Sequence, residues 1–212
     1  MAITVEQMYR IEEKGHAMGF LKKFMMENAG AAATRRLAAR TDLASKRVLV
    51  LAGLGNNGGD GMVMARHMAG RGADVTVCLM GDPGDIRTEE SSWNWSILEK
   101  MPSVRRIRWG DDAGDPDIII DAMLGTGISG DVREPYSSAI RYVNSARSLK
   151  VAVDVPTGLD PGTGAVSAAH TSCDMTVTFH RTKEGIPSRP DLTGDLYEEP
   201  IGIPPEAEEG IL

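Results

Sequence analysis

Cysteine is scarce in this sequence: Cys78 and Cys173 are the only two among 212 residues, and they do not form a CxxC pair. Two separated cysteines predict neither a disulfide framework nor a zinc site, and they favour a reducing compartment, by default the cytoplasm. Long hydrophobic runs are also missing, since no stretch approaches the roughly 20 apolar residues that span a bilayer. The first residues lack the basic and apolar regions of a signal peptide. We therefore expect a cytoplasmic protein that does not cross a membrane.

Basic residues are outnumbered as well: 30 acidic residues stand against 23 lysines and arginines, which gives a net charge of −7. A wide phosphate-binding surface is therefore not expected, which argues against nucleic acid as a partner but leaves room for one local anion site. Aromatic residues make up 5% of the chain, so aliphatic side chains and 12 methionines must supply most of the core. The length, together with 42% apolar residues, predicts one soluble globular domain over residues 1–212 that binds a small molecule.

Strand-like and helix-like patterns alternate along most of the chain. The first 45 residues are predicted to form two helices separated at 15–19. Strand-like apolar runs follow at 48–51, 75–80, 104–109, 118–124, 151–155 and 175–179, and the segment from Asp191 onward suggests a last edge strand with an acidic, solvated end. Helical patterns occupy 61–71, 87–101 and 135–147, the last beginning at Pro135. Apolar strands without alternation, separated by helices, predict a three-layer α/β domain around a parallel sheet.

A glycine-rich loop joins the first of these strands to the helix that follows. In the stretch LAGLGNNGGDG, Gly53, Gly55 and Gly58 fit the pattern GxGxxG. Glycine lets the backbone approach a ligand, and the free amides of the next helix attract an anion. As a dinucleotide fingerprint the match is incomplete, because no acidic residue stands about 20 residues on, at the end of the second strand. The alternative interpretation is a tight turn that allows close helix packing.

Two aspartates follow apolar strands. Asp121 comes after DIII and Asp154 comes after VAV. Because the carboxyl ends of parallel strands lie at one edge of a sheet, both are predicted to converge with the glycine-rich loop. A buried carboxylate is costly unless it is hydrogen-bonded, paired or bound to a cation. Either aspartate alone would be interpreted as the cap of a turn, but two together favour a functional site. His180 and Lys183 could reach the same edge, although their more common role is that of solvated loop residues.

Several motifs stand in the order found in one known family. MMENAG lies in the second predicted helix, and it is followed by GLGNNGGDGMVMARHM, DAMLGTGISGDVREPY, VDVPTGLDPGTG and VTFHRTKEG. From residue 5 to residue 204 the sequence resembles the NAD(P)HX epimerase family, also called the YjeF N-terminal domain. The resemblance implies a Rossmann-like three-layer α/β/α sandwich with a mostly parallel central sheet. The sequence departs from the family at Thr157, where many members carry serine, but both side chains offer a hydroxyl.

What the resemblance implies is an isomerase of nicotinamide nucleotide repair. The substrates would be hydrated NADH and NADPH (NADHX and NADPHX), whose R and S forms the enzyme interconverts so that an NAD(P)HX dehydratase domain, fused or separate, can restore the cofactor. The family also implies a homodimer with one K⁺ per subunit. The metal ligands would be Asn57, Asp121 and Thr157, and Asp154 would bind substrate and act as the catalytic residue. The other substrate-binding positions would be Asn56, Asn57, Gly58, Gly59, Asp60, Gly125, Thr126, Gly127, Ile128, Ser129, Gly130 and Asp131.

The chemistry of this reaction suits a carboxyl at Asp154. The hydroxyl on carbon six lies next to the ring nitrogen, so the centre is a hemiaminal. It inverts if hydroxide leaves and water returns on the other face, or if the ring opens and recloses, and either route needs a group that donates and then accepts a proton.

Two alternatives differ in class from this reading. One is an NAD-dependent oxidoreductase that uses GxGxxG in the ordinary way, which the missing acidic residue disfavours. The other is a non-catalytic nucleotide- or protein-binding scaffold of the same fold. A scaffold would not need to keep Asn57, Asp121 and Asp154 together, and this sequence has all three, which disfavours the scaffold.

Overall fold

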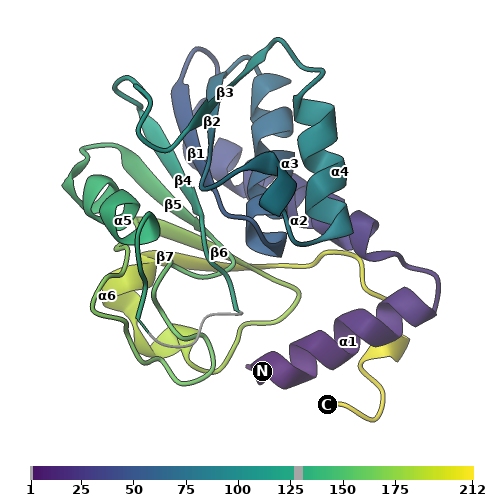
Figure 1. The fold of residues 1–212 in the computed structure, drawn as a ribbon. Helices are drawn as coiled ribbons and strands as arrows, with labels where there is room; N and C mark the ends of the chain where they lie inside the picture. Colours follow the sequence, from purple (N-terminus) through teal and green to yellow (C-terminus); the bar gives the residue numbers. More distant parts are fainter. Residues whose placement is uncertain (1, 127–130) are drawn as a thin grey trace.

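A seven-stranded parallel sheet organises the chain in the computed structural model, which describes residues 2–126 and 131–212 (Figure 1). The strand order is β3-β2-β1-β4-β5-β6-β7, and all neighbours pair in parallel. The strands are β1 Arg47–Ala52, β2 Asp74–Leu79, β3 Val104–Arg108, β4 Ile118–Ala122, β5 Leu149–Val153, β6 Met175–Phe179 and β7 Asp195–Glu199. Because the chain runs outward from β1 to β3 and then crosses back to β4, the order reverses between β1 and β4.

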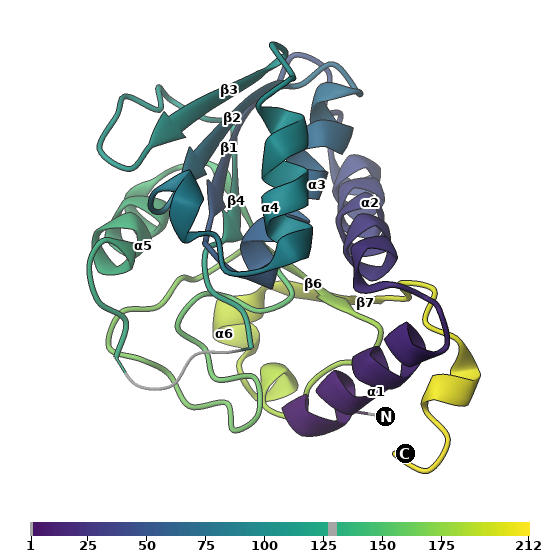
Figure 2. The same ribbon diagram turned by 45° about the vertical axis from the view of Figure 1, so that its right-hand side comes forward.

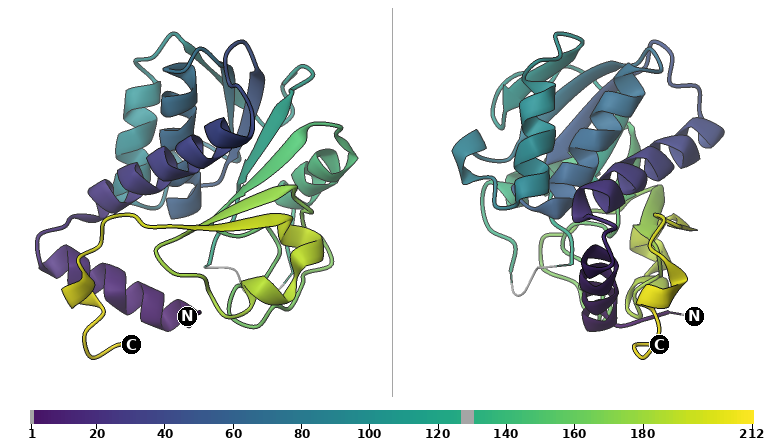
Figure 3. Two further views of the ribbon diagram at one scale, coloured as in Figure 1. Left: turned by 180° about the vertical axis from the view of Figure 1, so that it is seen from behind. Right: turned by 90° about the vertical axis from the view of Figure 1, so that its right-hand side faces the viewer.

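Helices cover both faces of this sheet. They are α1 Val5–Ala17, α2 Lys22–Arg40, α3 Asn56–Ala69, α4 Glu89–Leu98, α5 Tyr136–Ser145 and α6 Pro190–Thr193, with 3₁₀ turns at Pro83–Asp85, Ile186–Ser188 and Pro205–Ala207. α2, α3 and α4 form one outer layer and α5 lies on the opposite face (Figures 1 and 3). α1 stands apart from both layers, beyond the carboxyl ends of the strands (Figure 2). The predicted three-layer α/β/α sandwich is therefore confirmed.

The sheet separates two apolar clusters, because successive strand residues point to opposite faces. Val48 and Val50 of β1 join the cluster that includes α2 and α3, whereas Leu49 and Leu51 join the cluster that includes α5. Strands that are buried on both faces need an apolar residue at every position, which explains the runs without alternation. Among the described helices, none is long and apolar enough to cross a membrane.

Some element boundaries differ from the predicted ones. α3 begins at Asn56, inside the glycine-rich loop, and α5 begins at Tyr136, one residue after Pro135. The last residues of the chain are not simply a solvated surface, since Ile201 and Ile203 are buried. They return along α1 (Figure 3), so the two ends of the described chain stabilise each other.

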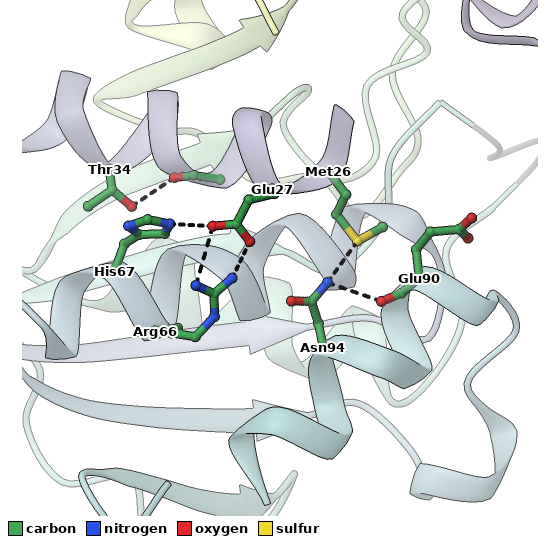
Figure 4. A network of polar contacts seen from close by, with 8 residues as sticks. Met26, Glu27, Thr34, Arg66, His67, Glu90 and Asn94 are labelled. Atoms are coloured by element: carbon green, nitrogen blue, oxygen red, sulfur yellow. Dashed lines mark hydrogen bonds and ion pairs between the residues drawn. The ribbon is translucent and has the colours of Figure 1, made fainter. Parts of the chain in front are cut away.

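A polar network fixes α2 against α3 and α4 (Figure 4). Glu27 accepts hydrogen bonds from Arg66 and lies 2.8 Å from Nε2 of His67. Asn94 donates to Sδ of Met26 at 3.3 Å. Met26 and Glu27 both belong to the MMENAG motif, so this motif holds α2 against α3 and α4.

α3 approaches its neighbours closely through glycine. A Cβ added at Gly61 would lie 2.5 Å from Cβ of Ala122 on β4, and one at Gly30 of α2 would lie 2.5 Å from Val63 of α3. Both distances are shorter than a carbon–carbon contact at optimal separation, about 3.5–4.0 Å. The helix can therefore sit at this height over the sheet only if these positions lack a side chain.

We expect the substitution Gly61→Ala to lower the free energy of unfolding by about 1–3 kcal/mol, because the added methyl group overpacks the interface between α3 and β4. Urea denaturation followed by circular dichroism measures the change. Gly84→Ala is the control, since a Cβ there meets nothing within 4 Å. Equal stability of the Gly61→Ala variant and the wild type would contradict the close contact.

Candidate active site

A cavity of about 420 Å³ opens at the carboxyl edge of the sheet, where the strand order reverses. Its walls come from the segments after β1, β4, β5 and β6, together with α1 and the beginning of α2. Open parallel sheets bind ligands in the crevice at such a switch point. The volume lies in the range of small-molecule sites, about 300–1,000 Å³.

Asp154 follows β5 directly and has one carboxylate oxygen held by three donors. Its Oδ1 accepts hydrogen bonds from Thr178 Oγ1 at 2.9 Å, Phe179 N at 3.3 Å and Lys183 Nζ at 2.6 Å. Within the part of the chain that the structure describes, no group donates a hydrogen bond to Oδ2. The backbone φ of 62° is uncommon for a residue other than glycine, and aspartate tolerates it better than most. The carboxyl group is thus fixed in place, and Oδ2 remains available to a ligand in the cavity.

Lys183 is buried, so its interpretation as a solvated loop residue is wrong: its side chain is 2% exposed. Besides the ion pair with Asp154, Nζ donates to Thr178 Oγ1 at 3.2 Å and to Phe179 O at 3.3 Å. These contacts use the three donors of the ammonium group, and a buried ion pair is tolerated when the remaining donors are satisfied in this way. The backbone at Lys183 forms a parallel β-bridge with Ile3, which carries the lysine into the interior.

Two more carboxyl groups, Glu12 of α1 and Asp60 of α3, line the same cavity. Burial raises the pKa of Glu12 to about 7; Lys183 opposes this shift and Asp154 adds to it. Burial also raises the pKa of Asp60 well above its ordinary value, and the negative charges of Asp154 and Glu12 add to that shift. One carboxylate is therefore paired with an ammonium group while two others are pushed toward their neutral forms. Such a difference in environment is how proteins assign acid and base roles to neighbouring carboxyls.

Asn57 lies in the first turn of α3 with an unpaired amide. It is 8% exposed, and among the described residues neither its oxygen nor its nitrogen has a hydrogen-bond partner. The backbone of Gly125 passes so close that a Cβ there would lie 3.1 Å from Cβ of Asn57. Leaving a buried polar group unpaired costs about 1–3 kcal/mol, so this amide is a candidate group for contact with a ligand.

Asp121 ties together the segments after β4 and β5. It is 1% exposed, and its Oδ1 accepts from Thr157 Oγ1 at 2.6 Å and Met123 N at 3.3 Å. Oδ2 accepts from Thr157 N at 2.9 Å and Thr171 Oγ1 at 2.6 Å, and Thr157 Oγ1 accepts from Leu124 N at 3.2 Å. Burial raises the pKa of Asp121 and the hydrogen bonds from Thr157 and Thr171 oppose that shift. Asp121 thus caps the turn at Thr157, which is the interpretation that either aspartate alone would receive from the sequence.

The glycines of the GxGxxG pattern differ in role. A Cβ at Gly53 would lie 1.8 Å from Met123 O, and one at Gly58 would lie 1.9 Å from Gly53 O, so these two permit contact between backbone segments. A Cβ at Gly55 would meet nothing within 4 Å. Gly55 precedes the first turn of α3, whose N-terminus has no side-chain cap from a described residue. Free amides at a helix N-terminus attract anions.

The structure places the predicted site residues unevenly around the cavity. Those that line it are Asn56, Asn57, Asp60, Gly125, Thr126 and Asp154. Among the described residues, those that do not line it are Gly58, Gly59, Asp121, Asp131 and Thr157. Gly127, Ile128, Ser129 and Gly130 lie outside the described residues. Nε2 of His180 lies 3.0 Å from Oε1 of Glu208, and His180 does not line the cavity either.

Sequence reasoning missed cavity residues that come from other elements: Glu12 on α1, Arg87 before α4 and Tyr136 at the start of α5. A signal was available for Glu12. It falls four residues after Met8 and seven after Val5, so an acidic side chain continues the inward face of the first helix.

The fold and the cavity define an α/β protein with a carboxylate-rich cavity at the switch point of a parallel sheet. The model of the family described as YjeF-related protein N-terminus matches residues 22–185, and the chain belongs to this family. α1, with Glu12, precedes the matched segment.

Named relatives and a solved structure agree with this assignment. The NAD(P)H-hydrate epimerase of Nitrosopumilus maritimus is 64% identical and that of Cenarchaeum symbiosum 62% identical, each match covering 100% of both chains. A bifunctional NAD(P)H-hydrate repair enzyme of Methanothermobacter thermautotrophicus is 42% identical over 90% of this chain and 38% of its own length. The crystal structure of yeast ynu0 (YNL200c) superposes with a TM-score of 0.76 at 25% identity, covering 89% of this chain and 84% of that one.

The variant Thr157→Val removes the hydroxyl that donates to Asp121 and keeps the shape of the side chain. We expect the free energy of unfolding to fall by about 1–3 kcal/mol, because a buried carboxylate loses a hydrogen bond. Thr157→Ser retains the hydroxyl and is the matched control, which should keep most of the stability. Chemical denaturation compares the variants, and an equal loss in both would contradict the role given to the hydroxyl.

Proposed function

We propose that this protein is an NAD(P)H-hydrate epimerase, which interconverts the R and S forms of hydrated NADH and NADPH. The observation that carries the proposal is the fixed carboxyl of Asp154, with one oxygen held by Lys183, Thr178 and Phe179 and the other without a donor among the described residues, at a cavity of about 420 Å³. The names of the full-length relatives support the same activity.

The reaction needs proton transfer to and from the oxygen that is bound to carbon six of the nicotinamide ring. Hydroxide leaves carbon six with help from the lone pair of the ring nitrogen, and water adds to the planar cation from the other face. A positioned carboxyl accelerates such steps by about 10²–10⁴-fold. Oδ2 of Asp154 is the oxygen that can take a proton from the incoming water, because Oδ1 is already saturated with donors.

The rest of the dinucleotide would lie along the loop after β1. The N-terminus of α3, after Gly55, offers free amides that suit a pyrophosphate. Asn56 and Gly125 line the adjacent wall, and Arg87 adds a positive charge to the cavity surface.

A potassium ion is part of the proposal. Asn57, Asp121 and Thr157 would hold it, since amide, carboxylate and hydroxyl oxygens suit this ion. Two observations support the fit. The amide of Asn57 has no hydrogen-bond partner among the described residues. The backbone brings the proposed ligands together, because Leu124 N donates to Thr157 Oγ1 and the next residue, Gly125, lies against Asn57. When bound, the ion would supply positive charge beside the buried carboxylate of Asp121. Within the described residues no group of three or more His, Cys, Asp or Glu side chains could hold a metal ion, so the site would combine the single carboxylate of Asp121 with neutral oxygen ligands.

The homodimer, the partnership with a dehydratase and the cytoplasmic location stay predictions. The family resemblance implies the homodimer and the dehydratase partner, and the composition favours the cytoplasm.

The direct test of the activity mixes the purified protein with the R form of NADHX or NADPHX and follows the S form by chromatography. We expect conversion faster than in buffer and a loss of at least about 100-fold in the Asp154→Asn variant, which keeps the shape of the side chain but cannot accept a proton. Asp85→Asn, at an exposed aspartate outside the cavity, is the control. A wild-type rate equal to that of the buffer blank would contradict the proposed function.

Potassium is tested by thermal unfolding at constant ionic strength in KCl and in N-methylglucamine chloride. An ion that binds only the folded state raises stability by about 2.7 kcal/mol at one hundred times its dissociation constant, so the midpoint should rise by several degrees in KCl. Asn57→Ala is expected to lose this rise and Asn56→Ala, at the exposed neighbouring position, to keep it. Equal midpoints of the wild type in both salts would refute the ion site.

A further inference from the structure

α1 presents one face to the cavity. Val5, Met8, Tyr9 and Glu12 all line it, at the spacing of three, four and seven residues that places side chains on one side of a helix. The helix lies beyond the carboxyl ends of the strands (Figure 2), whereas Asp154 comes from the sheet itself. Glu12 and Asp154 thus reach the same space from different walls.

The position of α1 is fixed by the chain around it. Ile3 N donates to Thr182 O at 2.9 Å and Glu184 N donates to Ile3 O at 3.0 Å, so the residues before the helix pair with the segment that carries Lys183. Thr4 and Gln7 then form a capping box that starts the helix. The same segment that buries Lys183 beside Asp154 therefore places α1, and with it Glu12, against the pair.

The carboxyl of Glu12 has no hydrogen-bond or ion-pair partner among the described residues. The charged groups that face it are Lys183, Asp154, Lys22, Glu13 and Asp60. Lys183 is bound to Asp154 and Lys22 to Glu13, so neither cation is committed to Glu12. With a pKa raised to about 7, mainly by burial, Glu12 exists in both protonation states near neutral pH, which suits a proton donor and acceptor.

The clamp on Asp154 limits what that residue can do. Three donors hold Oδ1, so the carboxyl cannot swing from one face of a bound ring to the other. Inversion requires hydroxide to leave from one face and water to arrive at the opposite face, and each event involves a proton. On the basis of the proposed epimerase function, we propose that Glu12 is a second catalytic residue, which exchanges a proton with the oxygen on the face that Asp154 does not serve.

One turnover moves one proton from Glu12 to Asp154 by way of the departing and arriving water, and proton exchange with solvent returns the pair to its starting state. Neutral Glu12 protonates the departing hydroxyl, the bond between carbon six and oxygen breaks, and the nitrogen lone pair forms the planar cation. Water then bonds to carbon six from the face of Asp154 and passes a proton to its Oδ2. The other epimer reacts by the same steps in reverse, with Asp154 as donor and Glu12 as acceptor. In either direction the pair must hold one proton in total.

The test compares kcat and KM of the wild type and Glu12→Gln from pH 5.5 to pH 9. For the wild type, kcat/KM should fall as the pH rises through about 7, since the pair then loses its shared proton. Glu12→Gln should lower kcat by at least about 100-fold with little change in KM, and should lose this fall. Glu12→Asp keeps a carboxyl that is one methylene shorter and should recover part of the rate. Glu6→Gln, on the exposed side of α1, is the matched control and should behave as the wild type.

The outcomes separate this inference from the proposed function. A wild type without activity contradicts the epimerase and the inference with it. An active wild type with a folded Glu12→Gln variant of unchanged kcat and unchanged pH profile overturns only the role of Glu12. If Asp60→Asn, and not Glu12→Gln, removes the fall near pH 7, the second proton carrier is Asp60 and the inference is wrong. Circular dichroism confirms that each variant is folded. The predicted fall of kcat/KM near pH 7 is measured on the wild type and does not depend on the folding of any variant.

Discussion

The ion pair between Lys183 and Asp154 is the interaction on which the site depends. It joins the end of β5 to the segment after β6, and the β-bridge at Ile3 joins that segment to the residues before α1. The Lys183 side chain is 2% exposed, so its ammonium group needs a partner, because removing one member of a buried pair leaves an uncompensated charge. One contact therefore orients the carboxyl of Asp154 and holds the wall of the cavity that carries Glu12.

A second group of residues builds the surroundings of this pair. Gly53 and Gly58 allow backbone segments to touch, Glu27 docks α2 on α3, and Asp121 binds the turn at Thr157. Much of what makes the sequence motifs recognisable is thus structural. Among the described residues of the cavity, the polar groups without a hydrogen-bond partner include Oδ2 of Asp154, the carboxyls of Glu12 and Asp60, and the amide of Asn57.

The sequence was sufficient for the sheet and for one edge of the site. Apolar strands and the position of Asp154 follow from local pattern, because strand ends of a parallel sheet share an edge. Lys183 could not be placed in this way. Its neighbours in the stretch HRTKEG are mostly polar, and its burial comes from pairing with Ile3, 180 residues earlier, which no local pattern encodes. Glu12 is a different case, because its spacing from Val5 and Met8 does place it on the inward face of the first helix, but the sequence does not show that this face borders a cavity. For Asp121 the sequence offered two interpretations, a functional residue or the cap of a turn, and the structure shows the cap, since Thr157 donates to both of its oxygens.

A crystal structure of the protein soaked with NADPH tests the central claim most directly, because the reduced dinucleotide differs from the substrate only by the water molecule added across carbons five and six. The account predicts the nicotinamide ring in the cavity, with carbon six within reach of Asp154 Oδ2 on one face and of Glu12 on the other, directly or through one water. It also predicts the pyrophosphate at the N-terminus of α3. A ring bound outside the cavity, or with both carboxyls on the same face, would contradict it.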